Sequence, residues 1–160
     1  MIPNPAVSTT YALLRAHGER LRALVGMKLV ATWMAWNRRD ERWFADEAVV
    51  LVFSGAQLEV VCLRLDQIVL TWGEIDPRQT PSWVADWSES DLEWRKDAHP
   101  AARAVVGRIV TAINAVEHLL PHEERWMLHG IELELGPRRL LVFNAQEDAQ
   151  EGGEYRRLAL

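Results

Sequence analysis

The sequence predicts an α+β protein made of two related halves, each a helix followed by a three-stranded antiparallel meander. Three observations predict this class. Short runs rich in Val, Leu, Thr and Trp are bounded by turn residues, the N-terminal region holds an amphipathic stretch, and an internal repeat recurs along the chain. Two such halves are expected to join their sheets into one larger sheet or a sandwich, with the helices on one face.

The internal repeat is the observation that defines the halves. Residues 22–26 (Arg-Ala-Leu-Val-Gly) return as residues 103–107 (Arg-Ala-Val-Val-Gly), and Trp43 returns as Trp126. Two further matches lie in the same order along the chain: residues 55–61 with 136–143, and Asp66 with Asp148. We therefore predict a single domain, 1–160, with internal duplication. Its parts are half one at about 8–73, a connector at 74–99, and half two at about 100–155.

The first half opens with a helix. Ser8 is a suitable N-cap, and the helix is expected to run to about Val25 with Leu14, Leu21, Leu24 and Val25 on one face. Gly18 weakens this helix by about 1 kcal/mol relative to alanine. Strands are predicted near 27–37, 48–54, 57–65 and 67–73, with a hairpin turn at 54–56.

The connector and the second half follow with a similar pattern. Residues 74–87 hold two prolines and predict a loop, and Ser88 with Asp91 resembles a capping box, which predicts a short helix near 89–97. Pro100 can open a second short helix over 100–106. Strands are predicted near 108–118, 130–135 and 139–144, and the acidic tail from Ala145 is expected to be loose before Tyr155.

One of these strands is ambiguous. Residues 102–120 carry apolar side chains at helical spacing and could form one amphipathic helix. The matching stretch of the first half, 27–37, is rich in Val, Thr and Trp, which prefer strands. We favour a strand over 108–118 on that comparison, and the helix stays open as the alternative.

Composition restricts the class of protein. The chain has 160 residues, one cysteine and a formal net charge of −5. All of that net charge falls in residues 81–160, which disfavours binding to nucleic acid and favours a basic partner. The N-terminus has no secretory signal, and the longest apolar run, 48–53, is far shorter than a membrane helix of about 20 residues. We expect a cytoplasmic protein with no membrane span.

The most distinctive surface feature is a run of tryptophan and acidic residues in the connector. Tryptophan is enriched at binding hot spots, and acidic neighbours would attract a basic partner. The alternative is that these tryptophans dock the connector onto the sheet. The candidate partner-binding residues are Trp83, Asp86, Trp87, Glu89, Asp91, Glu93 and Trp94.

The candidates for chemistry are weaker. His118 and His122, with Glu117, Glu123 and His129 nearby, offer zinc-type ligands, but Pro121 breaks the helix their spacing would need, so we expect an exposed loop and no metal. Glu132 and Glu134 share one face of a strand and are expected to form its wet side. Cys62, among apolar neighbours, predicts a buried inert thiol. We predict no cofactor.

These observations favour a non-enzymatic protein-binding module. The small, acidic, tryptophan-rich and motif-free composition is typical of bacterial toxin-immunity proteins, which neutralise a basic partner by covering it. A small-molecule or carbohydrate-binding β module is the first alternative. An enzyme that uses Glu132, Glu134 or the histidines, and a self-assembling subunit that forms homo-oligomers, are the others.

Overall fold

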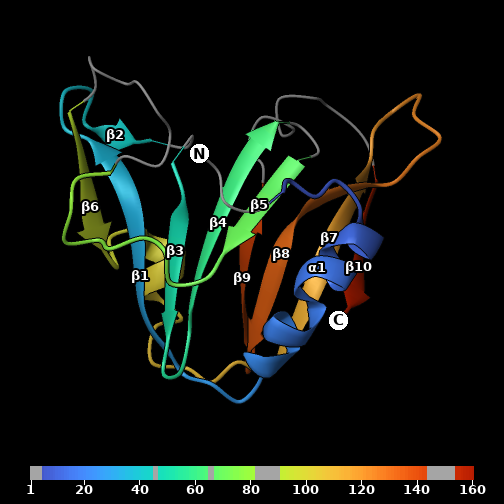
Figure 1. Ribbon diagram of the computed structural model, residues 1–160, viewed down its shortest axis with the longest axis horizontal. Coiled ribbons are helices and arrows are strands. Elements are labelled where there is room, and N and C mark those ends of the chain that lie inside the picture. The colour runs from blue at the N-terminus through green and yellow to red at the C-terminus, as the bar shows by residue number, and fades with distance from the viewer. Residues whose placement is uncertain (1–4, 45–46, 65–66, 82–90, 144–153) are drawn as a thin grey trace.

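The protein is mostly antiparallel β-sheet with two short helices (Figure 1). The computed structural model describes residues 5–44, 47–64, 67–81, 91–143 and 154–160. Neither of its helices has the length and apolar character needed to cross a membrane. The elements are α1 (Thr10–Ala23), β1 (Leu29–Asn37), β2 (Arg42–Trp43), β3 (Val49–Phe53), β4 (Gln57–Arg64), β5 (Gln67–Thr71), β6 (Leu92–Lys96), α2 (Pro100–Arg103), β7 (Ala112–Leu119), β8 (Met127–Leu135), β9 (Arg138–Phe143) and β10 (Glu154–Ala159).

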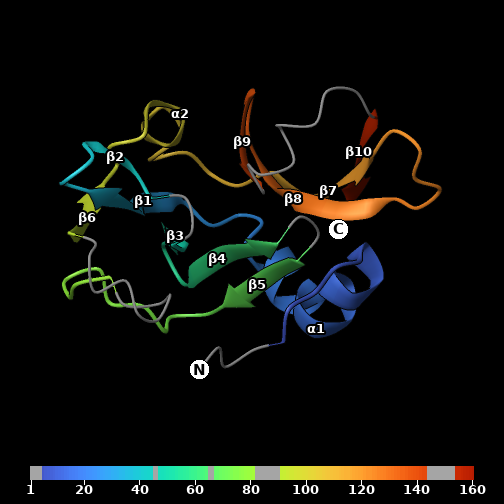
Figure 2. The ribbon, with the colours of Figure 1, turned by 90° about the horizontal axis from the view of Figure 1, so that it is seen from above.

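The strands form two sheets, which lie side by side in Figure 2. The first sheet has the order β2-β1-β3-β4-β5, and β6 also pairs with β1. The second sheet has the order β10-β7-β8-β9. Helix α1 packs beside β7, and its buried Leu13 and Leu21 join one core with Leu58 of β4 and Leu133 of β8. One hydrophobic core therefore spans both sheets.

Helix α1 begins one residue later than expected. Thr9, rather than Ser8, is the N-cap, because its hydroxyl accepts the N–H of Ala12 at 3.1 Å. The buried face is made by Leu13, His17, Gly18 and Leu21. Val25, expected on that face, is 46% exposed because the helix has ended at Ala23.

The two sheets are joined where the segment before β1 meets the segment before β7. Both segments contain a glycine with positive φ, 91° at Gly26 and 90° at Gly107. Residues other than glycine rarely adopt this backbone conformation. Four backbone bonds link them: Gly26 N to Val110 O (2.8 Å), Gly107 N to Leu29 O (2.7 Å), Val110 N to Met27 O (2.9 Å), and Leu29 N to Arg108 O (2.9 Å). The bond from Gly107 repeats the bond from Gly26 with the two segments exchanged. The bond from Leu29 repeats the bond from Val110 in the same way.

The central hairpins of the two sheets, β3–β4 and β8–β9, pair in the same register. Every pair between β3 and β4 has a counterpart between β8 and β9 that lies 82 residues further along. The pairs are Val49–Val60 with Ile131–Val142, Val50–Glu59 with Glu132–Leu141, Leu51–Leu58 with Leu133–Leu140, and Val52–Gln57 with Glu134–Arg139. The central hairpins of the two sheets are thus built alike.

The structure corrects two expectations about the elements. Residues 92–96 form strand β6, not a helix, because Leu92 and Trp94 alternate along a strand that pairs with β1, and this pairing outweighs the local capping signal. The structure also contains strands β2, β6 and β10, which were not among the predicted strands. The other strand positions are confirmed, as is the turn of helix at Pro100, and residues 112–119 of the ambiguous stretch are the strand β7.

Candidate functional site

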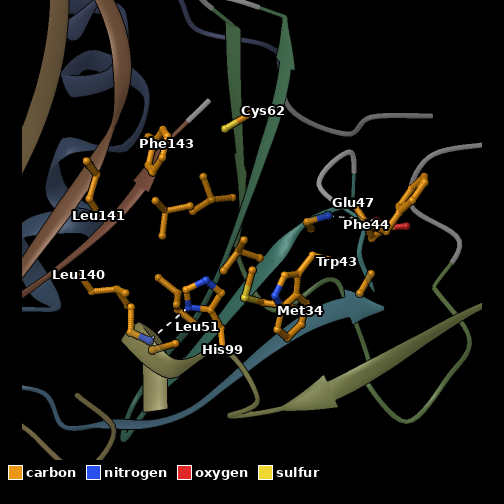
Figure 3. A pocket seen from close by; sticks show the side chains of 17 residues that line it. Met34, Trp43, Phe44, Glu47, Leu51, Cys62, His99, Leu140, Leu141 and Phe143 are labelled. Atoms are coloured by element: carbon orange, nitrogen blue, oxygen red, sulfur yellow. Dashed lines mark hydrogen bonds between the residues drawn. The ribbon is translucent and has the colours of Figure 1, made fainter. Parts of the chain in front are cut away.

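A pocket of about 330 Å³ lies between the two sheets. Figure 3 shows side chains from both sheets and from α2 converging on it. The described lining consists of Met34, Ala35, Trp43, Phe44, Glu47, Ala48, Val49, Leu51, Val60, Cys62, His99, Ala101, Ala102, Leu140, Leu141, Val142 and Phe143. The lining is dominated by hydrocarbon side chains, with Glu47, Cys62 and His99 as its titratable groups.

One wall of the pocket is the edge of strand β9. Four consecutive residues, Leu140 to Phe143, line it. Side chains of successive residues point to opposite faces of a sheet, so no single face can present four in a row. The pocket therefore faces the outer edge of β9. Leu141 and Phe143 are seen on this wall in Figure 3, with Met34 and Trp43 across from them.

A second corner is formed by Trp43 and His99, whose ring centroids lie 5.6 Å apart. Nδ1 of His99 accepts the N–H of Ala101 at 3.2 Å and caps α2, which fixes the orientation of the imidazole. Trp43 packs edge-on against Trp36 of β1, with ring centroids 4.9 Å apart. Both aromatic side chains are thus held in place by contacts with β1 and α2.

Behind this corner lie the described members of the acidic tryptophan segment. The guanidinium of Arg95 stacks over Trp36 at 4.3 Å and forms an ion pair with Glu93 at 2.7 Å. Asp91 hydrogen-bonds to Arg38, and this bond, with the charge of Asp91, raises the pKa of Arg38. Both acidic side chains are therefore engaged by arginines of the same chain.

The third described member of that segment, Trp94, packs on the first sheet against Ala48, Val61 and Val69. This is the docking arrangement considered as the alternative for the segment. The remaining predicted members, Trp83, Asp86, Trp87 and Glu89, lie outside the described residues.

The histidines lie where the sequence did not place them. His118 was expected in an exposed loop, but β7 continues to Leu119 and His118 is fully buried in it, with its ring stacked on Tyr155 at 4.2 Å. The ring centroids of His129 and His118 lie 5.5 Å apart, whereas His122 is exposed in the turn after β7. In the part of the chain that the structure describes, no group of three or more side chains is arranged to hold a metal.

The paired carboxylates of β8 are also in a different environment from the one expected. Glu132 is 2% exposed rather than on a wet face, because β10 brings Arg157 against it at 2.7 Å. Asn114 donates to both Glu132 (3.2 Å) and Glu134 (3.1 Å). The ion pair raises the pKa of Arg157, mainly through its hydrogen bond to Glu132. These contacts tie β10 to the sheet.

Sequence reasoning missed most of the pocket. Cys62 was expected to be buried and inert, yet it is half-buried and lines the cavity, because its side of β4 faces the space between the sheets. His99 carried one signal, its position directly before Pro100, which is typical of a helix N-cap. The edge of β9 could not be found without the relative placement of the sheets. Comparison with known proteins found no family model, no curated protein and no solved structure that matches the chain.

Proposed function

We propose that the chain is a binding protein whose ligand occupies the pocket between the two sheets. The observation that carries this proposal is the pocket itself, about 330 Å³ in volume and lined by residues from both sheets and α2. Ligand sites in proteins are typically concave, largely apolar, and of about 300 Å³ or more. Its aromatic corner is positioned by contacts with Trp36 and α2, so the site is largely formed before any ligand enters.

The chemistry of the lining favours an apolar ligand. Met34, Leu51, Val60 and the residues of β9 present hydrocarbon, whose removal from water contributes about 25 cal/mol per Å² of buried area. A sugar needs several directed hydrogen-bond partners, and the polar side chains of the described lining are few. The small-molecule alternative is therefore kept in its apolar form rather than as a carbohydrate site.

The proposal is tested with N-phenyl-1-naphthylamine, a neutral apolar dye, as the probe. We expect saturable one-to-one binding, and slower alkylation of Cys62, the only cysteine, by iodoacetamide when the dye is present. Cys62→Phe fills the cavity and should abolish binding. Val30→Phe adds an aromatic ring at a residue that is 46% exposed and does not line the pocket, and serves as the matched control. Binding that Cys62→Phe leaves unchanged would exclude this site.

A second candidate is the neutralising, toxin-immunity type of function, with a basic partner bound by the acidic tryptophan segment. It is favoured by Asp91 and Glu93, whose side chains are 47% and 33% exposed beside the pocket wall. Arg38 and Arg95 offset their charge locally, so the attraction would depend on the rest of the segment. Charge reversal at both acidic residues should slow association with a partner isolated from the native host, and an unchanged association rate would count against this placement.

We also propose that the two sheets descend from one duplicated unit of helix and meander. The proposal is supported by the common register of the two central hairpins and by the reciprocal bonds between the segments at Gly26 and Gly107. Strand β6 lies beside β1 as β10 lies beside β7, which extends the correspondence to the outer strands. A polypeptide of residues 100–160 alone that forms a folded dimer would support a common origin.

A further inference from the structure

We propose that the ligand of the pocket is an extended peptide segment of a partner protein, which adds to the edge of β9 as the next strand of the second sheet. This inference rests on the proposed function and specifies its ligand. Strand addition uses main-chain hydrogen bonds for affinity and pockets for alternate side chains for specificity. The site offers both, since the edge of β9 and the apolar pocket are the same wall.

The edge of β9 is available for pairing. It is the last strand of the second sheet, and among the described residues no backbone bond joins it to anything but β8. The two-residue turn at 136–137 closes with a hydrogen-bonded pair, and such pairs alternate along an antiparallel ladder. The alternation directs the N–H and C=O groups of Arg139, Leu141 and Phe143 away from β8 and toward the pocket.

The first sheet shows what fits at this position. Strand β4, whose pairing with β3 has the register of β9 with β8, carries β5 on its outer edge, with Val60 opposite Leu70 and Cys62 opposite Ile68. The corresponding place beside β9 holds no strand in the described part of the chain. A peptide that paired with β9 as β5 pairs with β4 would run antiparallel to β9 and would bring apolar side chains to the cavity.

Charge indicates the direction and one end of the peptide. Arg138 at the start of β9 is exposed, and none of the ion pairs found in the described residues includes it. A strand antiparallel to β9 would place its C-terminal end beside Arg138. We therefore expect a segment with two alternating apolar residues followed by Asp, Glu or a terminal carboxylate.

The test begins with a phage-displayed library of random dodecapeptides panned on the intact chain. The most enriched peptide is then synthesised with a fluorescein label, and its binding is measured by fluorescence anisotropy. Leu141→Pro removes one outward N–H, which an edge strand tolerates, and should weaken binding at least about tenfold. Leu141→Ala removes the same side chain from the pocket but keeps that N–H, so it should weaken binding clearly less than Leu141→Pro, and Arg138→Glu should weaken peptides with an acidic end.

A measurement on the unmodified chain does not depend on how the variants fold. Bound peptide should slow hydrogen exchange at the amides of Leu141 and Phe143 by about tenfold or more, because these N–H groups would enter a ladder. Unchanged exchange at both amides with peptide bound would overturn strand addition.

The remaining outcomes separate this inference from the proposed function. If the naphthylamine dye binds in the pocket but no peptide is enriched, the inference fails and the proposed function stands. If neither binds, both fail. If sedimentation shows a dimer that Leu141→Pro dissociates, the occupant of the edge is a second copy of the chain, and the inference of a foreign peptide is overturned.

Discussion

Glu59 provides a sharp test of how the first sheet is held together. It lies in β4 with no exposed surface, and its carboxylate accepts hydrogen bonds from four donors. These are Thr71 Oγ1 (2.6 Å), Gln57 Nε2 (2.6 Å), Glu74 N (3.0 Å) and Ile75 N (3.2 Å). The side chain therefore fastens both β5 and the start of the connector to β4.

The effect of removing this carboxylate on the free energy of unfolding depends on which of its four donors can hydrogen-bond to water instead. The Thr71 hydroxyl is fully buried and would lose its acceptor, whereas the N–H of Glu74 lies in an exposed residue. A stranded buried donor costs about 1–3 kcal/mol, and a hydrogen bond to a charged acceptor contributes about 1.5–3 kcal/mol net. We expect Glu59→Ala to lower the free energy of unfolding by about 3 kcal/mol. Glu59→Gln, which keeps the shape, should lower it by about 1 kcal/mol.

The assay is urea unfolding followed by tryptophan fluorescence, with Thr71→Val added to complete a double-mutant cycle. The double variant Glu59→Ala, Thr71→Val leaves no stranded hydroxyl, so its destabilisation should fall short of the sum of the single variants by about 1 kcal/mol or more. Additive effects, or a loss below about 1 kcal/mol for Glu59→Ala, would refute the assigned network.

Three further predictions concern other parts of the fold. Gly26→Ala and Gly107→Ala should each cost about 1–2 kcal/mol of unfolding free energy, and by similar amounts, because φ is 91° and 90°. Unequal losses in urea unfolding would argue against equivalent turns. Gly130→Ala should cost more than about 2 kcal/mol, since its Cβ would collide with the backbone of β9, whereas Gly55→Ala meets a flexible methionine at 3.4 Å and should have little effect. Burial, aided by a nearby arginine, lowers the pKa of His17 below 6.5, so the folded state binds this proton less readily than the unfolded chain. Stability should fall as pH drops below 6.5, by up to about 1.4 kcal/mol per pH unit, and a His17→Gln variant that keeps the full slope in pH-dependent unfolding would contradict this cause.

The strands with strong local patterns could be predicted from the sequence. Residues 48–54 and 57–65 are β-branched and apolar runs separated by a turn, and they form the hairpin of β3 and β4. Strand β6 could not be found, because its local signal is a capping box and its partner is β1, more than fifty residues earlier in the chain. Pairing at a distance decided this segment, and a single sequence carries no record of it.

The candidate site was harder to predict than the fold, because its residues are distant in the sequence and come together only through tertiary packing. Trp43, Cys62 and His99 lie in different elements, and no spacing along the chain connects them. The sequence predicted Glu93 as a partner-binding residue, and the structure connects it to the lining residue Trp43 through Arg95 and Trp36. The cavity itself is created by the packing of the two sheets, which no local pattern in the sequence records.

One pair of corresponding positions differs between the two sheet edges. Glu59 in β4 and Leu141 in β9 occupy the same place in their hairpins, opposite Val50 and Glu132. Glu59 binds Thr71 and fastens β5 to the edge of β4, so that edge is filled from within the chain. Leu141 offers no acceptor and lines the pocket instead. On the duplication that we propose, the first hairpin carries a carboxylate that fastens a further strand and the second hairpin does not, and in the described part of the chain the outer edge of β9 pairs with no strand.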